Sequence, residues 1–267
     1  MKLPVAIIIL TKNEELNLPA CLGSIRDWSD EIFIVDSFSV DDTEKIADRY
    51  AAKFVQHQFE NQAQQFNWAL ANLPVVSPWI LKLDADERMT RELWEEIAAV
   101  LPRLGPNIGG LLMKRRVYFL GRWIRHGGYY PAWFLRLFRR GLAKSEEREM
   151  DEHLVLLDGR TQKLKNDFID ENKKDLSWWT QKHNEYAGRE VQAVVRRPFS
   201  GNQRLNFYYR WPILWRALFY FLYRYFFQLG FLDGREGLIF HFLQGGWYRF
   251  LVDAKLDEYK KGIAKDK

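Results

Sequence analysis

The first hundred residues alternate between short apolar runs and longer segments in which apolar residues recur every three or four positions. The short runs have the length of buried strands, and the longer segments have the spacing of amphipathic helices. Strands that alternate with helices indicate βαβ units and a mainly parallel sheet. The expected strands cover residues 5–10, 32–35, 54–55 and 79–83, and the expected helices begin near residues 17, 39, 63 and 91.

The pattern changes after Gly109. The alternate positions Leu111, Met113, Arg115 and Val117 predict a half-buried strand, and a loop rich in glycine and aromatic residues follows. Further strands are expected at 133–138 and 151–156, and Asp158-Gly159 is typical of a hairpin turn. A long helix is expected over 172–195. We therefore expect an α/β domain over residues 1–165 and a helical region over 166–267.

The end of the chain mixes aromatic residues with arginine. Residues 211–231 form an apolar and aromatic run in which Arg216, Arg224 and Gln228 are the only charged or amide side chains. Residues 238–252 repeat this mixture of aromatic residues and arginine. Such side chains suit a membrane–water interface, where the apolar body is buried and the polar tip stays wet. Helices packed on a core or on a second subunit would show the same pattern. We expect no conventional membrane-spanning helix, because no charge-free apolar run reaches 18 residues.

Composition narrows the choice of compartment and ligand. The single cysteine, Cys21, excludes an internal disulfide and fits a reducing, cytoplasmic setting. Residues 3–10 resemble a signal-peptide core, but only Lys2 precedes them and no small-residue cleavage site follows, so a buried strand is expected. The net charge of +5 suits a phosphate-bearing ligand or an anionic membrane surface. No nucleic-acid-binding motif, zinc spacing or glycine-rich phosphate loop is present, so no nucleic-acid partner is expected.

Polar side chains follow three of the expected strands. In chain order they are Thr11, Asn13, Glu14, Asp36, Asp84 and Asp86. In a parallel α/β sheet, ligands bind just past the carboxyl ends of the strands, so these side chains are expected to share one crevice. Two aspartates at i and i+2 can share one hard divalent cation and leave room for phosphate oxygens. The sequence therefore predicts a site for a metal and a phosphorylated ligand.

With these strand ends in place, the chain resembles the family 2 inverting glycosyltransferases of the GT-A fold. The matching segments are TKNEE at 11–15, VDSFSVDDT at 35–43 and LDADE at 83–87. Within the family it is similar to bacterial enzymes that extend lipopolysaccharide core, capsule and exopolysaccharide chains. That closer likeness rests on QFNWA at 65–69, RLFR at 136–139, Glu152-His153 and the stretch 182–186.

The resemblance implies a Rossmann-like α/β fold of the GT-A type, with the helical, aromatic-rich region as an extension. It implies a nucleotide-sugar donor, with a UDP-hexose expected. Asp36 would accept a hydrogen bond from the base and Glu14 would lie near the ribose, in a turn that also holds Thr11 and Asn13. Gln65 is expected to join this nucleotide-binding group.

The resemblance also implies a divalent metal, Mg²⁺ or Mn²⁺, on the donor diphosphate. Asp86 would reach this metal, and Asp84 would lie nearer the ribose and the sugar. Glu152 matches the catalytic base, with Asp151 as the second candidate. A positioned carboxylate suits the chemistry, because the acceptor hydroxyl must lose its proton as it attacks.

The expected acceptor is lipid-linked or a polysaccharide, and the expected place of work is the inner face of the cytoplasmic membrane. A homo-oligomer is a further possibility. Two other functions fit the sequence less well. A nucleotidyltransferase would need a glycine-rich loop after the first strand, and residues 11–16 contain no glycine. A non-catalytic membrane adaptor would be expected to lose Asp84 and Asp86, and both are present.

Overall fold

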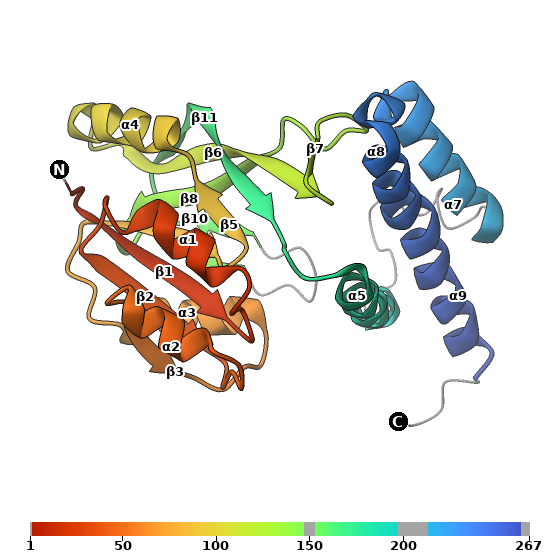
Figure 1. The fold of residues 1–267 in the computed structure, drawn as a ribbon, viewed down its shortest axis with the longest axis horizontal. Helices are drawn as coiled ribbons and strands as arrows, with labels where there is room; N and C mark the ends of the chain where they lie inside the picture. Colours follow the sequence, from red (N-terminus) through yellow and green to blue (C-terminus); the bar gives the residue numbers. More distant parts are fainter. Residues whose placement is uncertain (1, 147–152, 197–212, 263–267) are drawn as a thin grey trace. The chain divides into compact units, whose positions relative to one another are not determined.

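The structure is a computed structural model that describes residues 2–146, 153–196 and 213–262. The chain divides into two compact units. The first comprises Met1–Tyr118 and Pro131–Lys173, and the second comprises Phe119–Tyr130 and Lys174–Lys267. The first is α/β, and the described part of the second is helical apart from a short strand, which confirms the expected fold class (Figure 1).

The first unit is built around one large sheet. Its strands follow the order β3-β2-β1-β4-β8-β6-β11-β5. The strands are β1 (Val5–Thr11), β2 (Glu31–Asp36), β3 (Lys53–Gln56), β4 (Trp79–Asp84), β5 (Glu87–Met89), β6 (Ile108–Phe119), β8 (Trp133–Arg139) and β11 (Arg160–Glu171). Pairing among β1 to β4 is parallel, as expected, whereas β8 runs antiparallel to both β4 and β6.

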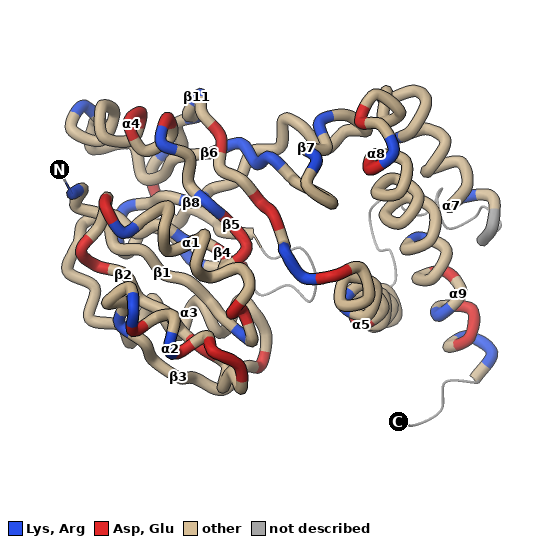
Figure 2. The backbone as a smooth tube through the Cα atoms, viewed as in Figure 1, with Lys and Arg blue, Asp and Glu red and all other residues tan. Residues whose placement is uncertain are grey.

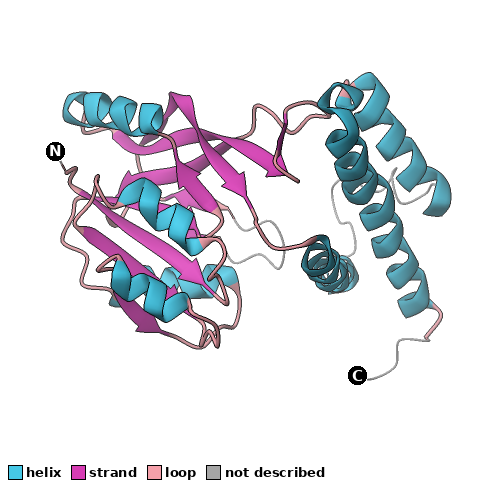
Figure 3. Ribbon diagram, in the orientation of Figure 1, coloured by secondary structure: helices cyan, strands magenta, loops and turns pink. Residues whose placement is uncertain are grey.

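Strand β1 lies at the centre because its apolar run can be buried on both faces. Ile7 and Ile9 pack into one core cluster with Leu22, and the alternate residues Ala6 and Ile8 pack into a second. This two-sided burial is typical of parallel sheets that are covered by helices on both faces. The helices of this unit are α1 (Leu18–Ile25), α2 (Thr43–Arg49), α3 (Gln62–Asn72) and α4 (Arg91–Val100), followed by the 3₁₀ turn η1 (Leu101–Arg103), as Figure 3 shows.

One expectation about this unit is wrong. Asp158-Gly159 is no hairpin turn, because the strands on either side of it pair with other partners. Strand β10 (Leu154–Leu156) pairs antiparallel with β9 (Ala143–Ser145), and β11 pairs parallel with β6. Gly159 still allows a sharp change of direction, since its φ is +85°.

The second unit contains β7 (Arg122–Ile124) and a group of helices. These are α5 (Leu176–Arg196), α7 (Ile213–Leu222), the π-helical turn η2 (Tyr223–Phe227), the 3₁₀ turn η3 (Gly230–Asp233), α8 (Gly234–His241), the π-helical turn η4 (Phe242–Trp247) and α9 (Tyr248–Lys260). Helices α5 and α9 share a small core that includes Ala187, Val191 and Val252. Among the described helices, none has both the length and the apolar character needed to cross a membrane.

His183 on α5 gives this unit a testable pH dependence. Its Nδ1 lies 2.8 Å from the carbonyl of Trp179 and its Nε2 lies 2.8 Å from Nε2 of Gln244, partners that suit a neutral ring protonated on Nδ1. Burial lowers the pKa of His183 to about 4. The unfolded chain takes up this proton near pH 6.5, so stability should be lost as the pH falls from about 6.5 towards 4.

We expect His183→Gln to weaken this pH dependence. Between pH 7.5 and pH 5.5 the wild type should lose about 1 kcal/mol more of its free energy of unfolding than the variant does. Melting curves of both proteins at the two pH values would measure this difference. Equal losses in the two proteins would contradict the assignment of a neutral, buried His183.

Candidate active site

Asp84 is held in place at the carboxyl end of β4. Gln62 on α3 donates from Nε2 to Asp84 Oδ1 at 3.3 Å, and Arg136 on β8 donates from Nη2 to Asp84 Oδ2 at 3.2 Å. The backbone N–H of Asp84 donates to Glu87 Oε2 at 3.0 Å. These contacts come from three elements, so the carboxylate has a defined orientation even though its side chain remains 28% exposed.

Asp86 lies in the turn between β4 and β5 and is held by the end of β11. Asn172 donates from Nδ2 to Asp86 Oδ2 at 2.9 Å, and the N–H of Glu171 donates to the Asp86 carbonyl at 2.9 Å. The turn thus places both aspartates at the same edge of the sheet.

These residues fit a divalent cation that is shared with a ligand. In the described part of the chain, no three His, Cys, Asp or Glu side chains are arranged to hold a metal by themselves. Mg²⁺ is commonly bound through one or two carboxylates together with substrate phosphates and water. Asp84 and Asp86 match the carboxylate part of that donor set.

A buried ion pair lies beneath this turn. Glu87 and Arg136 are 2% and 8% exposed, and Arg136 bonds to both Glu87 and Asp84. Burial raises the pKa of Glu87, while Arg136 acts in the opposite direction. Removing one partner of such a pair is expected to leave an uncompensated buried charge.

Arg136→Met should therefore destabilise the first unit by about 3–5 kcal/mol. Chemical denaturation would measure the loss, and the added change Glu87→Gln should restore part of it. Arg91→Ala is the matched control, because the Arg91–Glu95 pair lies on an exposed helix face and contributes little. An Arg136→Met protein that is as stable as the control would show that the pair does not support this turn.

A fourth carboxylate makes this edge of the sheet acidic. Asp170 on β11 pairs in register with Glu87 on β5 and lies 3.3 Å from Nη1 of Arg115. Burial, with added repulsion from Asp86, raises the pKa of Asp170 to about 7. A cation bound at this turn would offset the repulsion between Asp170 and Asp86.

The predicted nucleoside residues form a second group, at the ends of β1 and β2. Thr11 and Asp36 are paired in the parallel register, and Thr11 donates from Oγ1 to Asp36 Oδ1 at 2.8 Å. The N–H of Ser39 donates to Asp36 Oδ2 at 2.7 Å. Asp36 is fully buried, so its carboxylate also fixes the loop that follows β2.

Asn13 and Glu14 join the same loop from the β1 side. Asn13 has a φ of +53°, accepts from the N–H of Val40 at 2.9 Å and donates its own N–H to Ser39 Oγ at 2.7 Å. Glu14 accepts from Asn17 Nδ2 at 2.8 Å. The structure therefore brings Thr11, Asn13 and Asp36 together, with Glu14 beside them.

Gln65 is placed behind this loop. It is 1% exposed, its Oε1 lies 2.7 Å from Nδ1 of His57, and its Nε2 donates to Ser37 Oγ at 3.2 Å. A buried side chain with these partners would act on a nucleotide through Ser37.

Glu152 and Asp151, the two candidates for the base, lie outside the described residues. The described residues on either side are held together: Ser145 and Leu154 are paired across β9 and β10, and the N–H of Glu146 donates to the carbonyl of His153 at 2.9 Å. Asn67 on α3 anchors this hairpin through two hydrogen bonds to the backbone of Ser145, at 2.8 and 2.9 Å.

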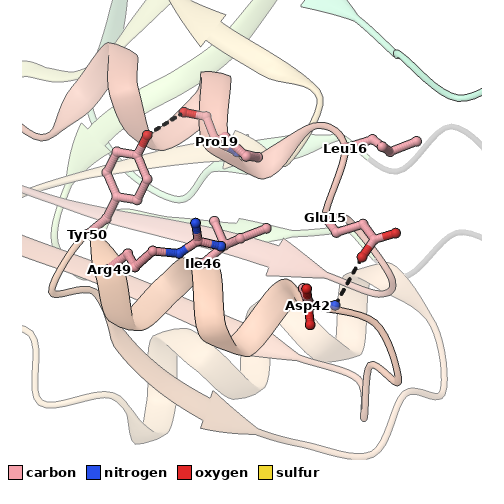
Figure 4. Close-up of a pocket in the computed structure, with 7 residues that line it drawn as sticks. All are labelled: Glu15, Leu16, Pro19, Asp42, Ile46, Arg49 and Tyr50. Carbon is pink, nitrogen blue, oxygen red and sulfur yellow. Dashed lines mark hydrogen bonds between the residues drawn. The ribbon is translucent and has the colours of Figure 1, made fainter.

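A separate pocket of about 330 Å³ lies between the start of α1 and α2 (Figure 4). Its lining residues are Glu15, Leu16, Pro19, Asp42, Ile46, Arg49 and Tyr50. Glu15 accepts from the N–H of Asp42 at 3.1 Å, and the Tyr50 hydroxyl donates to the Pro19 carbonyl at 3.2 Å. It includes none of the predicted site residues.

Several residues of the acidic edge were not assigned a role from the sequence. These are Gln62, Glu87, Arg115, Arg136, Asp170 and Asn172. The sequence gives a reason to expect a role for Arg136, because a charged residue inside the otherwise apolar strand 133–138 needs a buried partner. It gives no such reason for Asp170 and Asn172, because the strand that delivers them was not expected.

Comparison with known proteins assigns the chain to a family. The sequence model of glycosyl transferase family 2 matches residues 6–228. The lipopolysaccharide core biosynthesis glycosyltransferase LpsC of Rhizobium meliloti is 27% identical over 266 residues, which cover 96% of this chain and 92% of that protein. An uncharacterized glycosyltransferase of Rickettsia conorii is 36% identical over 93 residues, and this match spans 32% of its length.

The structure of residues 1–349 of Staphylococcus aureus TarS in complex with UDP-GlcNAc has a similar fold. Its TM-score is 0.50 at 16% identity, and the alignment covers 98% of this chain and 92% of that one. At this identity the likeness concerns the fold alone. The family match spans most of the chain, including β1, β2 and β4 with their polar ends. The chain belongs to glycosyl transferase family 2.

Proposed function

We propose that the protein is an inverting hexosyltransferase that moves a sugar from a UDP-sugar to a lipid-linked or polysaccharide acceptor. One observation carries the proposal: Asp84 ends β4 and Asp86 follows it, while Thr11 and Asp36 end the adjacent parallel strands β1 and β2. Metal-binding and nucleoside-binding groups thus share the edge at which ligands of α/β sheets bind. The UDP-GlcNAc complex of TarS and the role named for LpsC support this choice of donor and acceptor.

In this proposal Asp36 accepts a hydrogen bond from the base, and Glu14 lies near the ribose. Thr11 and Asn13 keep the two loops in register through their bonds to Asp36 and Ser39. Gln65 donates a hydrogen bond to Ser37 and so fixes this residue in the loop after β2. Together these bonds preorganise the nucleoside site, which reduces the entropy lost on binding.

Asp86 and Asp84 would hold the divalent metal, Mg²⁺ or Mn²⁺. When bound, this metal supplies Lewis-acid stabilisation of the negative charge on the departing diphosphate. Asn172 orients Asp86, and Gln62 with Arg136 orients Asp84, so the two carboxylates are fixed before the donor arrives. Ligands that are held by such outer partners bind metal more tightly.

Glu152 takes the proton of the acceptor hydroxyl, with Asp151 as the alternative base. The hydroxyl oxygen then forms a bond to the anomeric carbon of the donor sugar. The bond from that carbon to the diphosphate oxygen breaks, and its electron pair leaves with UDP. Attack from the face opposite the leaving group inverts the configuration in one displacement.

The proposed place of work is the cytoplasmic face of a membrane, because the acceptor is lipid-linked. The second unit would provide the contact. Its aromatic residues would also serve a contact between two copies of the chain, which is the competing explanation for their exposure.

A donor panel tests the proposal. Hydrolysis of UDP-, GDP- and dTDP-sugars would be measured with Mn²⁺, with Mg²⁺ and with EDTA. We expect turnover of one UDP-hexose that EDTA abolishes. Turnover that is confined to a nucleoside triphosphate plus a sugar phosphate would instead identify a nucleotidyltransferase.

A further inference from the structure

Helix α7 buries a charged side chain while it exposes its apolar ones. Arg216 is 6% exposed and forms a bidentate ion pair with Asp253 of α9, which is 2% exposed. On the same helix Trp215, Leu218 and Phe219 are 51%, 39% and 47% exposed. In a helix that packs only against its own core, the apolar residues face inward and the charges face water. This distribution therefore calls for an apolar or interfacial environment outside the unit.

The exposed residues continue into η2 at helical spacing. Tyr223, Phe226 and Phe227 are 52%, 54% and 80% exposed. With the three residues of α7 they form a set that we call the aromatic face: Trp215, Leu218, Phe219, Tyr223, Phe226 and Phe227. Ring stacking orders the set along its length, since Trp215 stacks on Phe219 and Tyr223 stacks on Phe227. Exposed apolar groups in a contiguous series usually mark an interaction surface.

Three arginines lie on or next to β7 and at the start of α8, and both elements contact the turn η3 that follows the aromatic face. Arg122, Arg125 and Arg235, which we call the basic rim, are all exposed. Figure 2 shows the corresponding positive segments at β7 and at the start of α8. In residues 119–130 and 215–238, the acidic side chains are Asp233, which is buried, and Glu236. The exposed charge of these segments is therefore positive.

Hydrogen bonds connect the loop that follows Arg125 to the turn that follows the aromatic face. The N–H of His126 donates to Asp233 Oδ2 at 2.8 Å, and its Nδ1 lies 2.6 Å from Asp233 Oδ1. The N–H of Gly127 donates to the Gln228 carbonyl at 2.8 Å, and Arg224 Nε donates to the Gly127 carbonyl at 2.6 Å. The loop after Arg125 and the turn after Phe227 are consequently fixed against each other.

We propose that this surface docks on an anionic lipid bilayer. The aromatic face would enter the boundary between headgroups and acyl chains, and the basic rim would contact lipid phosphates. Aromatic rings and arginines together are suited to that boundary, and each basic residue near an anionic leaflet adds to the attraction. The proposal rests on the proposed function for its biological meaning, since a lipid-linked acceptor is found at such a surface.

A second copy of the chain fits this surface less well. A twofold contact places the same residues of both copies around one axis. The basic rims would then share one interface, with Glu236 as the one partly exposed carboxylate that these segments offer. An anionic bilayer supplies the missing negative charge.

Co-sedimentation with vesicles tests the proposal. The full-length protein would be mixed with vesicles of phosphatidylcholine alone, or of equal parts phosphatidylcholine and phosphatidylglycerol. We expect binding to the anionic vesicles, and Phe226→Ser/Phe227→Ser should weaken it about tenfold or more. Arg125→Gln/Arg235→Gln should do the same. Phe250→Ser/Tyr259→Ser is the matched control, because it removes two exposed aromatics of α9 from outside the aromatic face, and its binding should stay within twofold of wild type.

Three results would overturn the proposal. The first is absence of wild-type binding to anionic vesicles, and the second is an equal loss in the control variant. The third is a wild-type protein that is a dimer and a Phe226→Ser/Phe227→Ser variant that is a monomer, with equal vesicle binding by the two proteins. UDP binding, measured on the same proteins, separates this proposal from the proposed function. Vesicle binding without UDP binding would refute only the latter, and UDP binding without vesicle binding would refute only the docking surface.

Discussion

Asp86→Asn is expected to lower metal-dependent turnover of the donor by about a thousandfold. The substitution keeps the size of the side chain but removes the charge that would hold the metal against the diphosphate, and stabilisation of the leaving group is lost with it. The measurement is donor hydrolysis with saturating Mn²⁺, together with calorimetric titration of UDP. Folding should be preserved, because the asparagine oxygen can still accept from Asn172.

Asp48→Asn is the control for this variant, since it neutralises an exposed carboxylate of the same unit on α2. It should leave turnover unchanged. If Asp86→Asn keeps activity within tenfold of wild type, the turn after β4 is not the metal and diphosphate site.

Glu152→Gln should have the second largest effect. With acceptor present, we expect kcat to fall by about 10²–10⁴-fold, while the KM for the donor changes little. A base acts on the acceptor hydroxyl in the transition state, so its loss lowers the rate without weakening the nucleotide contacts. Steady-state transfer assays with separate variation of donor and acceptor would measure both constants.

Asp151→Asn is the matched control, because it makes the same chemical change one residue away. A large fall in kcat for Asp151→Asn with an active Glu152→Gln would move the role of base to Asp151. Full activity in both variants would show that the base lies elsewhere in the chain.

The polar ends of β1, β2 and β4 could be predicted from the sequence, because these strands are short, local and apolar. The run at residues 5–10 and the run at 79–83 are buried whatever their exact partners, so the polar residues that end them must lie at the sheet edge. Parallel pairing then brings Thr11 beside Asp36 in adjacent strands. Periodicity, together with the expectation of a parallel sheet, was sufficient for this part.

The residues at the end of β11 that support Asp86 could not be predicted in the same way. Strand β11, with the sequence RTQKLKNDFIDE, carries charged or amide side chains at most positions. It forms because β6 and β5 offer it backbone partners from distant parts of the chain. Tertiary pairing of this kind overrides weak local preference. Asp170 and Asn172 were missed for this reason.

The end of the chain shows another limit of sequence patterns. Helical spacing in residues 213–227 indicates amphipathic helix, yet it does not reveal which side faces the protein. The structure shows that Arg216 faces inward because Asp253 can pair with it there. A buried charge needs such a partner, and the partner lies 37 positions further along the chain.

Calorimetric titration of the wild-type protein with UDP, in Mn²⁺ and again in EDTA, tests the proposed donor site most directly. UDP should bind with one site per chain in Mn²⁺ and at least about tenfold more weakly in EDTA, because Asp84 and Asp86 would reach the diphosphate through the metal. Failure of UDP to bind in Mn²⁺ would contradict the proposed site, and so would equal affinity in the two buffers.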